Sequence, residues 1–296
     1  MKHFIYIFIV LLVAFSAMSQ PGAPDINFAD GRIFTSQIDT TPDEAKAVAI
    51  QPDGKIVTAG YFGISSFDSS TGEDFYLRRF NADGSPDTDF GEDGIVIQDL
   101  AEGVDAAWDV EIQDDGKIVA AGFGWQSWER ALVMRLNQDG SLDETFSGDG
   151  IAVIEVGGFT DRIWGIEIQP DGKIVGCGTC FISASDFDWC AVFDRSLAIS
   201  NPDGLLQVEF ENNGKVIENI STGSDIIYEN EPDDDRKIIA AGTMESETSG
   251  EEVYGMALVK FLDQFDLGII DQNTRGELLV YPNPIAGSAT LRFDLM

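Results

Sequence analysis

An eleven-residue segment recurs along this chain at intervals of about sixty residues. Its copies are IQPDGKIVTAG at 50–60, IQDDGKIVAAG at 112–122, IQPDGKIVGCG at 168–178 and an eroded form, EPDDDRKIIAAG, that ends at 242. The equivalent lysines are spaced by 62, 56 and 64 residues: Lys55, Lys117, Lys173 and Lys237. A near-constant period of this length predicts one supersecondary unit that is used four times.

Each unit contains segments with the pattern of β-strands. In the second copy, Trp108, Val110 and Ile112 alternate with polar residues, which is the period of a strand with two unlike faces. The glycine in Asp114-Asp115-Gly116 suits a tight hairpin turn. Further strands are expected over 117–122, 131–136 and 150–156. Four antiparallel strands per unit, joined by longer connections between units, are typical of propeller blades.

The two ends of the repeat region are unequal. The segment from Pro24 to Gln37 resembles residues 86–98, which hold only the last strand of a unit and its lead-in. The fourth unit has candidates for its first three strands, around 226–230, 237–242 and 256–262, but no convincing fourth. We therefore expect an all-β propeller of about four four-stranded blades over residues 24–270, closed by a strand at Gly31 to Gln37. An open arc, or a ring completed by a second chain, is the alternative.

The repeat resembles a known family in its combination of motifs. I-Q-x-D-G-K-I-V-x-A-G is followed by N-x-D-G-S-x-D and then by F-x-x-D-G, as in the delta-60 repeat of bacterial secreted β-propellers. The resemblance covers about residues 24–265. The third copy departs from it at 193–202, and the fourth lacks the glycine turn at 233–235. The resemblance implies a propeller and export, and it implies no particular activity.

Residues 1–19 have the features of a secretory signal peptide. Lys2 precedes an apolar core from Phe4 to Phe15, and Ala17-Met18-Ser19 forms a small-residue cleavage site. The apolar core is too short to span a bilayer, which needs about twenty residues. We expect a protein without a membrane span after cleavage, located outside the cell or on its outer surface.

The C-terminal segment, residues 276–296, resembles a second family. LLVYPNPIAGSATLRF at 278–293 is similar to the opening of the sorting domain used by type IX secretion. Only about one strand follows the Tyr-Pro-Asn-Pro motif, too little to bury a core, so the sequence predicts a truncated copy. The type IX secretion machinery is a partner only if this domain is intact in the full gene. An ordinary proline-rich tail is the alternative.

Charge and histidine content exclude several classes of function. The chain carries 52 acidic and 18 basic residues, and loss of Lys2 with the signal peptide leaves 17 basic residues and a formal charge of about −35. Such a surface repels nucleic acid. His3 is the sole histidine, so a mature chain has no Ser-His or Cys-His nucleophile pair and no His-ligated metal. We assign no catalytic, cofactor-binding or metal residue from the sequence.

Two groups of acidic residues are nevertheless candidates for cation binding. The turns at 81–87 and 137–143 present oxygen atoms at alternate positions, as short calcium loops do, although Asx turns use the same residues for local hydrogen bonds. Calcium is therefore an alternative to a structural turn, which we favour. Glu111, Glu167 and Glu229 are expected at equivalent places in three first strands, with Ala49 in the first unit. They could approach a central channel, but solvated channel walls are the simpler interpretation.

The cysteines and repeated lysines are given structural roles. Cys180 and Cys190 are expected to pair across a hairpin in an exported protein, whereas Cys177 is expected to be a small buried residue in an apolar strand. A redox centre in the Cys-Gly-Thr-Cys segment is disfavoured because no thioredoxin-like pattern surrounds it. Lysines after the turns, such as Lys55, are expected to keep the hairpins soluble rather than form a basic ring.

For function, the sequence favours a non-enzymatic binding or structural role, with a glycan, a peptide or another protein as ligand. The alternative is a glycoside-cleaving propeller, because that chemistry needs only two carboxylates at a fixed separation. A pocket with facing carboxylates and aromatic walls, for instance from Trp125, Trp128 or Trp189, would distinguish the two classes.

Overall fold

The computed structural model describes the repeat region in most detail. The described residues are 25, 27–30, 43–63, 73–100, 103–125, 128–156, 160–181, 193–200, 202–205, 215–218, 225–232, 237–248, 251–261, 277–280 and 289–292. Within these ranges the chain is all-β, apart from one 3-10 turn, η1 (Phe28–Asp30). The all-β prediction is therefore confirmed.

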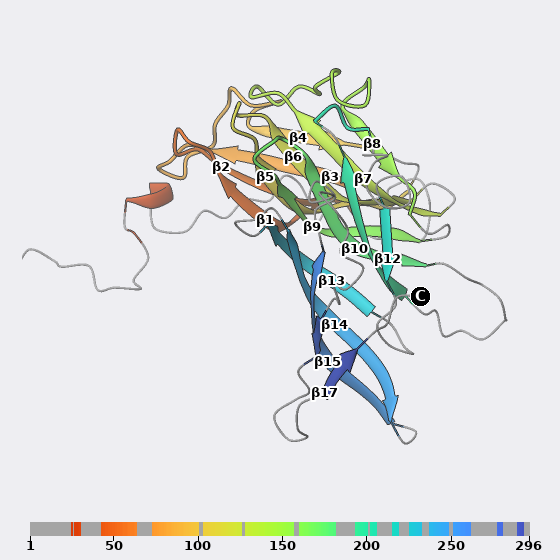
Figure 1. Cartoon of the computed structure of the whole chain (residues 1–296). Coiled ribbons are helices and arrows are strands. Elements are labelled where there is room, and N and C mark those ends of the chain that lie inside the picture. Colours follow the sequence, from red (N-terminus) through yellow and green to blue (C-terminus); the bar gives the residue numbers. More distant parts are fainter. Residues whose placement is uncertain are drawn as a thin grey trace, which may run out of the picture.

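Three four-stranded antiparallel sheets follow one another along the chain, each with its strands in sequence order (Figure 1). The first sheet, blade 1, consists of β1 (Asp43–Ile50), β2 (Ile56–Phe62), β3 (Asp74–Phe80) and β4 (Ile95–Gln98). Blade 2 consists of β5 (Asp105–Ile112), β6 (Ile118–Trp125), β7 (Glu129–Leu136) and β8 (Ile151–Ile154). Blade 3 consists of β9 (Asp161–Ile168), β10 (Ile174–Phe181), β11 (Phe193–Ser200) and β12 (Lys215–Glu218).

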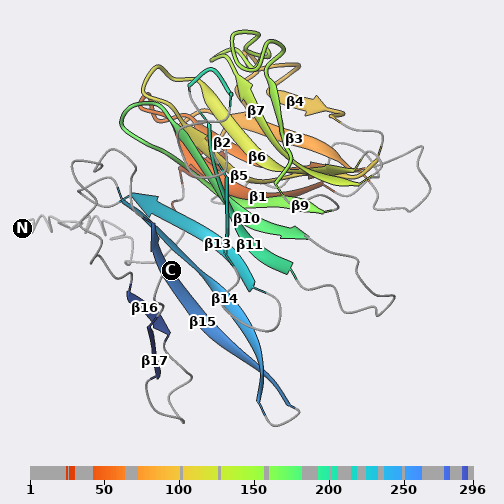
Figure 2. The ribbon, with the colours of Figure 1, turned by 45° about the vertical axis from the view of Figure 1, so that its right-hand side comes forward.

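The fourth sheet, blade 4, has three described strands: β13 (Asp225–Pro232), β14 (Ile238–Thr248) and β15 (Glu251–Phe261). Its strands extend away from the other blades, and the hairpin of β16 (Glu277–Val280) and β17 (Ala289–Arg292) lies beside β15 (Figure 2). The strand expected at Gly31 to Gln37 lies outside the described residues. Closure by that strand, and a count of four complete blades, therefore stay predictions.

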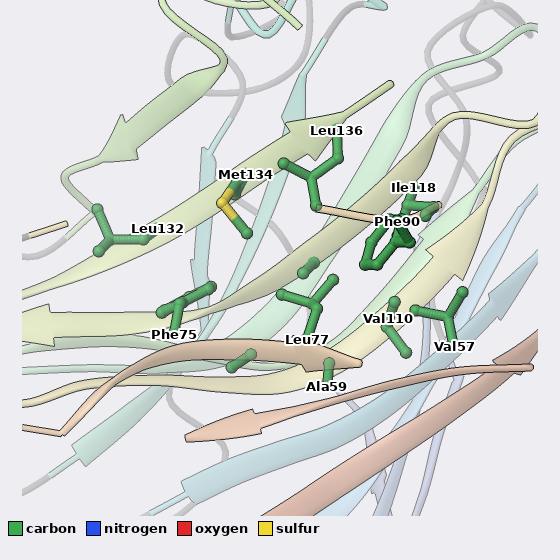
Figure 3. Close-up of a cluster of buried hydrophobic side chains, with 12 residues drawn as sticks. Val57, Ala59, Phe75, Leu77, Phe90, Val110, Ile118, Leu132, Met134 and Leu136 are labelled. Carbon is green, nitrogen blue, oxygen red and sulfur yellow. The ribbon is translucent and has the colours of Figure 1, made fainter. Parts of the chain in front are cut away.

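Each blade packs through its first strand onto the blade before it. β5 contacts β1, β2 and β3, while β9 contacts β5, β6 and β7, and β13 contacts β9, β10 and β11. The first of these junctions buries Phe75, Leu77 and Phe90 of blade 1 against Val110 and Met134 of blade 2 (Figure 3). We call the side of a blade that meets the preceding blade its leading face, and the opposite side its trailing face.

Every first strand carries one extra residue at the same place. The pairing register slips at Lys46, Trp108, Trp164 and Tyr228, which are the bulge positions of β1, β5, β9 and β13. The last glycine of the repeat lies opposite each bulge, where a Cβ atom would come within 1.9 Å of a carbonyl oxygen. These glycines are Gly60, Gly122, Gly178 and Gly242. Only glycine allows this close approach, which explains why the repeat ends in it.

A phenylalanine from one blade packs against a glycine turn of the next. Phe90 lies against Gly140, and Phe146 lies against Gly204, with both rings fully buried. Backbone hydrogen bonds accompany these contacts, from Gly91 N to Asp139 O at 2.8 Å and from Ser147 N to Asp203 O at 2.6 Å. We call this arrangement the Phe–Gly latch.

An arginine and an aspartate reinforce two of the junctions. Arg79 Nε donates to Asp87 Oδ2 at 2.7 Å, and the Arg79 Nη1 group donates to the Gln138 carbonyl of blade 2. In the next unit, Arg135 Nε donates to Asp143 Oδ2 at 2.7 Å and Arg135 Nη1 donates to the Pro202 carbonyl of blade 3. In the third unit the register places Ile199 at the arginine position, so this reinforcement is absent from the junction of blades 3 and 4.

Candidate functional site

Five carboxylates gather where the first strands of blades 2, 3 and 4 approach one another. They come from β5, β9 and β13 and interact electrostatically across the blades: Asp109, Glu111, Glu167, Glu229 and Glu231. We call this group the acidic cluster. The bulges lie just before it on each strand, so the extra residue helps to set which side chains face the neighbouring blade.

The structure corrects the predicted equivalence of these residues. Glu111 pairs with Val119 and Glu167 pairs with Val175, each two residues beyond the repeat lysine. The residue of β13 in this register is Glu231, which pairs with Ile239, whereas Glu229 pairs with Ala241 and corresponds to Asp109. The prediction that named Glu229 as the third equivalent is therefore wrong by two positions. Ala49 of β1, which pairs with Val57, is equivalent as expected.

Glu167 has the most perturbed acidity of the cluster. Burial, followed by the charges of Glu111 and Glu231, raises the pKa of Glu167 to about 7. Burial and the charge of Asp109 likewise raise the pKa of Glu111 above its usual range. At neutral pH the cluster therefore holds at least part of a proton and acts as a coupled set rather than as independent acids.

Asp109 joins two blades through its carboxylate. Asp109 Oδ1 accepts a hydrogen bond from Val110 N at 2.8 Å, and Oδ2 accepts one from Ile166 N of blade 3 at 2.7 Å. Burial raises the pKa of Asp109, although these two backbone donors act against that shift. Both oxygens are engaged, so Asp109 positions β9 against β5 rather than offering an open ligand.

Aromatic and cationic side chains lie at the bulges and beside them, close in sequence to the cluster. Trp108 and Trp164 meet edge to face with ring centroids 4.7 Å apart. Lys46 Nζ lies 4.7 Å from the Trp108 ring centroid, and the Arg162 guanidinium lies 5.7 Å from that of Trp164. Tyr228, the equivalent residue of β13, is 43% exposed.

The described tryptophans that the sequence suggested as aromatic walls of a carboxylate pocket lie away from the acidic cluster. Trp125 ends β6 and Trp128 precedes β7, and they are 45% and 48% exposed. Val119, which pairs with Glu111, is six positions from Trp125 along β6, or roughly 20 Å at the rise of a strand. The structure therefore separates these two tryptophans from the acidic cluster. Trp189 lies outside the described residues.

A second group of carboxylates lies at the junction of blades 1 and 2. One carboxylate oxygen from each of Asp74, Asp99 and Asp105 falls within 4.8 Å of the others. In the following unit the corresponding place is held by an ion pair, Arg130 Nε to Glu155 Oε1 at 3.2 Å. Burial, followed by the charge of Asp99, raises the pKa of Asp74. Among the described residues, these three aspartates form a group that could take a divalent cation, and no sequence motif pointed to them because they come from three separate segments.

The turns considered as calcium loops use their oxygens locally. Asp83 Oδ1 accepts from Ser85 N at 2.9 Å, and Asp139 Oδ1 accepts from Ser141 N at 3.0 Å, as in Asx turns. The Asp139 carbonyl is part of the Phe–Gly latch. These contacts support a structural role for both turns.

Two of the repeat lysines have specific partners that the sequence did not indicate. Lys55 Nζ lies 2.8 Å from Asp87 Oδ2, and Lys117 Nζ lies 2.9 Å from Asp143 Oδ2. Each lysine therefore completes the arginine–aspartate contact of its blade. They do not form a basic ring.

The cysteines of blade 3 include an unreactive thiol. Burial raises the pKa of Cys177 to about 12, so almost no thiolate is present at neutral pH. Cys180 is also buried on β10. Cys190 lies outside the described residues, so its pairing with Cys180 stays a prediction.

Comparisons with known proteins bear mainly on the fold. The family model described as "Domain of unknown function (DUF5122) beta-propeller" matches residues 51–90 and 113–146. This match supports the interpretation of the chain as a β-propeller repeat protein. No curated protein matches the chain.

Solved structures with a partial likeness include two arabinanases. One is Cellvibrio cellulosa alpha-L-arabinanase complexed with arabinohexaose, at 10% identity and a TM-score of 0.39, covering 75% of this chain and 77% of that one. Another is an exo-1,5-alpha-L-arabinanase from a bovine ruminal metagenomic library, at 9% identity and a TM-score of 0.36, covering 79% and 76%. Likenesses this distant do not bear on activity.

Among the described residues, no helix has the length and apolar character of a membrane span.

Proposed function

We propose that this chain is a propeller enzyme that cleaves glycosidic bonds with carboxylates of the acidic cluster. The observation that carries the proposal is the raised pKa of Glu167, about 7, beside further carboxylates from the neighbouring blades. Glycoside cleavage needs one carboxyl group that stays protonated near neutral pH and a second that is ionised. The absence of a usable histidine from the repeat region leaves this among the few acid–base mechanisms open to the chain.

Roles for individual residues follow from the electrostatics. Glu167 is the proton donor to the glycosidic oxygen, because its protonated form persists to about pH 7. Glu111 exerts the largest charge effect on Glu167 and is the second carboxylate, which acts on the sugar or on a water molecule. Tyr228, which directly precedes Glu229 on β13, offers an exposed aromatic ring on which a sugar face can stack.

The test is release of reducing ends from a panel of plant and bacterial polysaccharides. Glu167→Gln should lower the rate by about 100-fold or more, since a general acid contributes at least that much. The wild-type rate should fall as the pH rises through about 7, where Glu167 loses its proton. Glu92→Gln, on the exposed turn before β4, is the matched control and should be unaffected. Release that survives Glu167→Gln would contradict the proposal.

The second candidate is a non-enzymatic role in glycan binding. It is favoured by Trp125 and Trp128, which are both about half exposed and lie away from the acidic cluster. Exposed tryptophans suit sugar stacking without catalysis. Binding to a glycan array that is lost in Trp125→Ala, with no product release by the wild type, would favour this role over cleavage.

We also propose that the protein is secreted and that its repeats are of the delta-60 type. The apolar segment within residues 1–19 supports secretion, and residues 276–296 support sorting by type IX secretion if the sorting domain is intact in the full gene. The match at 51–90 and 113–146 supports assignment to the delta-60 type of repeat. Detection of the mature chain in culture medium, with its first residue at Gln20, would test the secretion step.

A further inference from the structure

The two end blades each expose a face whose equivalents at internal junctions are buried or partly buried wherever the structure describes them. On the leading face of blade 1, Val48 is 63% exposed and Ile50 is 71% exposed. Val110 and Ile166 hold the position of Val48 in blades 2 and 3, and both are only 2% exposed because the preceding blade covers them. The leading face of blade 1 therefore has the composition of an interior surface.

The trailing face of blade 4 shows the complementary pattern. Met256 and Leu258 of β15 are 56% and 37% exposed. The residues of β3 in the same register are Phe75 and Leu77, and both are fully buried against blade 2. Leu77 belongs to the same buried cluster as Val110, and Figure 3 shows their side chains near each other. A face like that of blade 4 is therefore the kind of surface that covers a face like that of blade 1.

The remaining elements of a junction are present at the same two ends. Phe28 of η1 packs against Gly84 of blade 1, and Ala29 N donates to Asp83 O at 2.7 Å. These contacts are those of the Phe–Gly latch. At the internal junctions the phenylalanine of the latch comes from the preceding blade, whereas here it comes from η1. At the other end, Glu229 occupies the position of Asp109, whose carboxylate binds the backbone amide of the next blade. In blade 1, the residue at the position of Ile166 is Val48, so the backbone amide of Val48 is the equivalent donor.

We propose that the leading face of blade 1 binds the trailing face of blade 4 of a second copy of this chain. Within the part of the chain that the structure describes, the succession of junctions runs from β1 to β13, and β1 shares no comparable junction with blade 4. A second copy covers both faces at once. Two copies related by a two-fold axis then form two identical head-to-tail junctions and a ring of eight sheets, within the usual range for propellers.

The first test is the mass in solution, measured by light scattering after gel filtration at micromolar concentration. The wild type should have the mass of two chains. Val48→Asp and Leu258→Lys should each be folded monomers by circular dichroism, since both positions are exposed in the single chain. Val153→Asp is the matched control, because Val153 on β8 of the internal blade 2 is 59% exposed and should not affect the mass.

A mixing experiment distinguishes this contact from closure within one chain. Val48→Asp mixed with Leu258→Lys should restore a dimer, because one of its two junctions is wild type and the other pairs an aspartate with a lysine. A wild-type monomer, or an assembly that persists in both single variants, overturns the proposal. So does a mixture that stays monomeric while each variant is folded.

Discussion

Arg135 has an unusual position for a charged residue, because it is buried and links two blades. Its guanidinium binds Asp143, reaches the Pro202 carbonyl of the next blade and lies 4.6 Å from the Phe146 ring centroid. Arg79 repeats the arrangement one unit earlier. A buried ion pair of this kind adds little stability compared with an apolar contact, but loss of one partner leaves the other charge poorly compensated.

Substitution of Arg135 should therefore be costly. Arg135→Met should lower the free energy of unfolding by about 3 kcal/mol, since Asp143 stays buried and keeps only Lys117 as a charged partner. Urea denaturation measures the change. Arg130→Met is the matched control, because its partner Glu155 is 69% exposed, and it should cost less than about 1 kcal/mol. Equal losses in the two variants would contradict this account.

The turn that receives the Phe–Gly latch is the element on which each junction depends. Gly140 has φ of +89°, and a Cβ there would lie 2.7 Å from Gly91 N and 3.0 Å from the Phe90 ring. The glycine is thus required both by its backbone conformation and by the neighbouring blade. Gly148 has a similar φ of +94° but nothing within 4 Å of a Cβ.

This pair of glycines separates backbone strain from packing. Gly148→Ala should cost about 1 kcal/mol, which is the penalty of the left-handed conformation alone. Gly140→Ala should cost about 2 kcal/mol more, because the rigid ring of Phe90 must move. Thermal or urea unfolding of both variants measures the difference. If both variants lose the same stability, the latch contributes less than the structure suggests.

The stability of the whole molecule has two contributions that change with pH in opposite directions. One comes from the acidic cluster of blades 2 to 4, and the other comes from the buried ion pairs of blades 1 and 2. The folded-state pKa of Glu167 is raised to about 7 from the ordinary value of 4.5, so the folded chain binds more protons than the unfolded chain between these values. Stability therefore falls as the pH rises through this window. In contrast, hydrogen bonds from Thr145 and Lys117 outweigh burial and hold the pKa of Asp143 below its usual range, so its contribution is lost in more acidic solution.

The unfolding temperature should accordingly be highest near pH 4 to 5, where neither penalty is fully expressed. A scan by differential scanning calorimetry should show a decline from there to about pH 7 that is smaller in Glu167→Gln. Asp143→Asn should instead reduce the loss below pH 4. A rise in stability between pH 5 and 7 would contradict the placement of Glu167.

The sequence predicted the strands well and their contacts less well, for physical reasons. Alternation and glycine turns are local signals, so the segments around 131–136 and 237–242 were found as strands. The fourth copy lacks the glycine turn, and this loss hid the equivalence of Glu231 with Glu167, although each glutamate precedes its repeat lysine by six residues. The partner of Lys117, Asp143, comes from a later turn of the same unit, and spacing alone could not reveal that ion pair.

Every latch runs from an earlier part of the chain to the turn of the blade that follows, including the contact of Phe28 in η1 with Gly84. The order of these contacts has a consequence for biosynthesis. A chain that emerges from the ribosome with its N-terminus first can complete each sheet before the next is made, and each finished sheet then serves as a template for its successor. Assembly need not wait for the C-terminus, and the junction of blades 3 and 4, where Ile199 stands at the position of the arginine, is formed last.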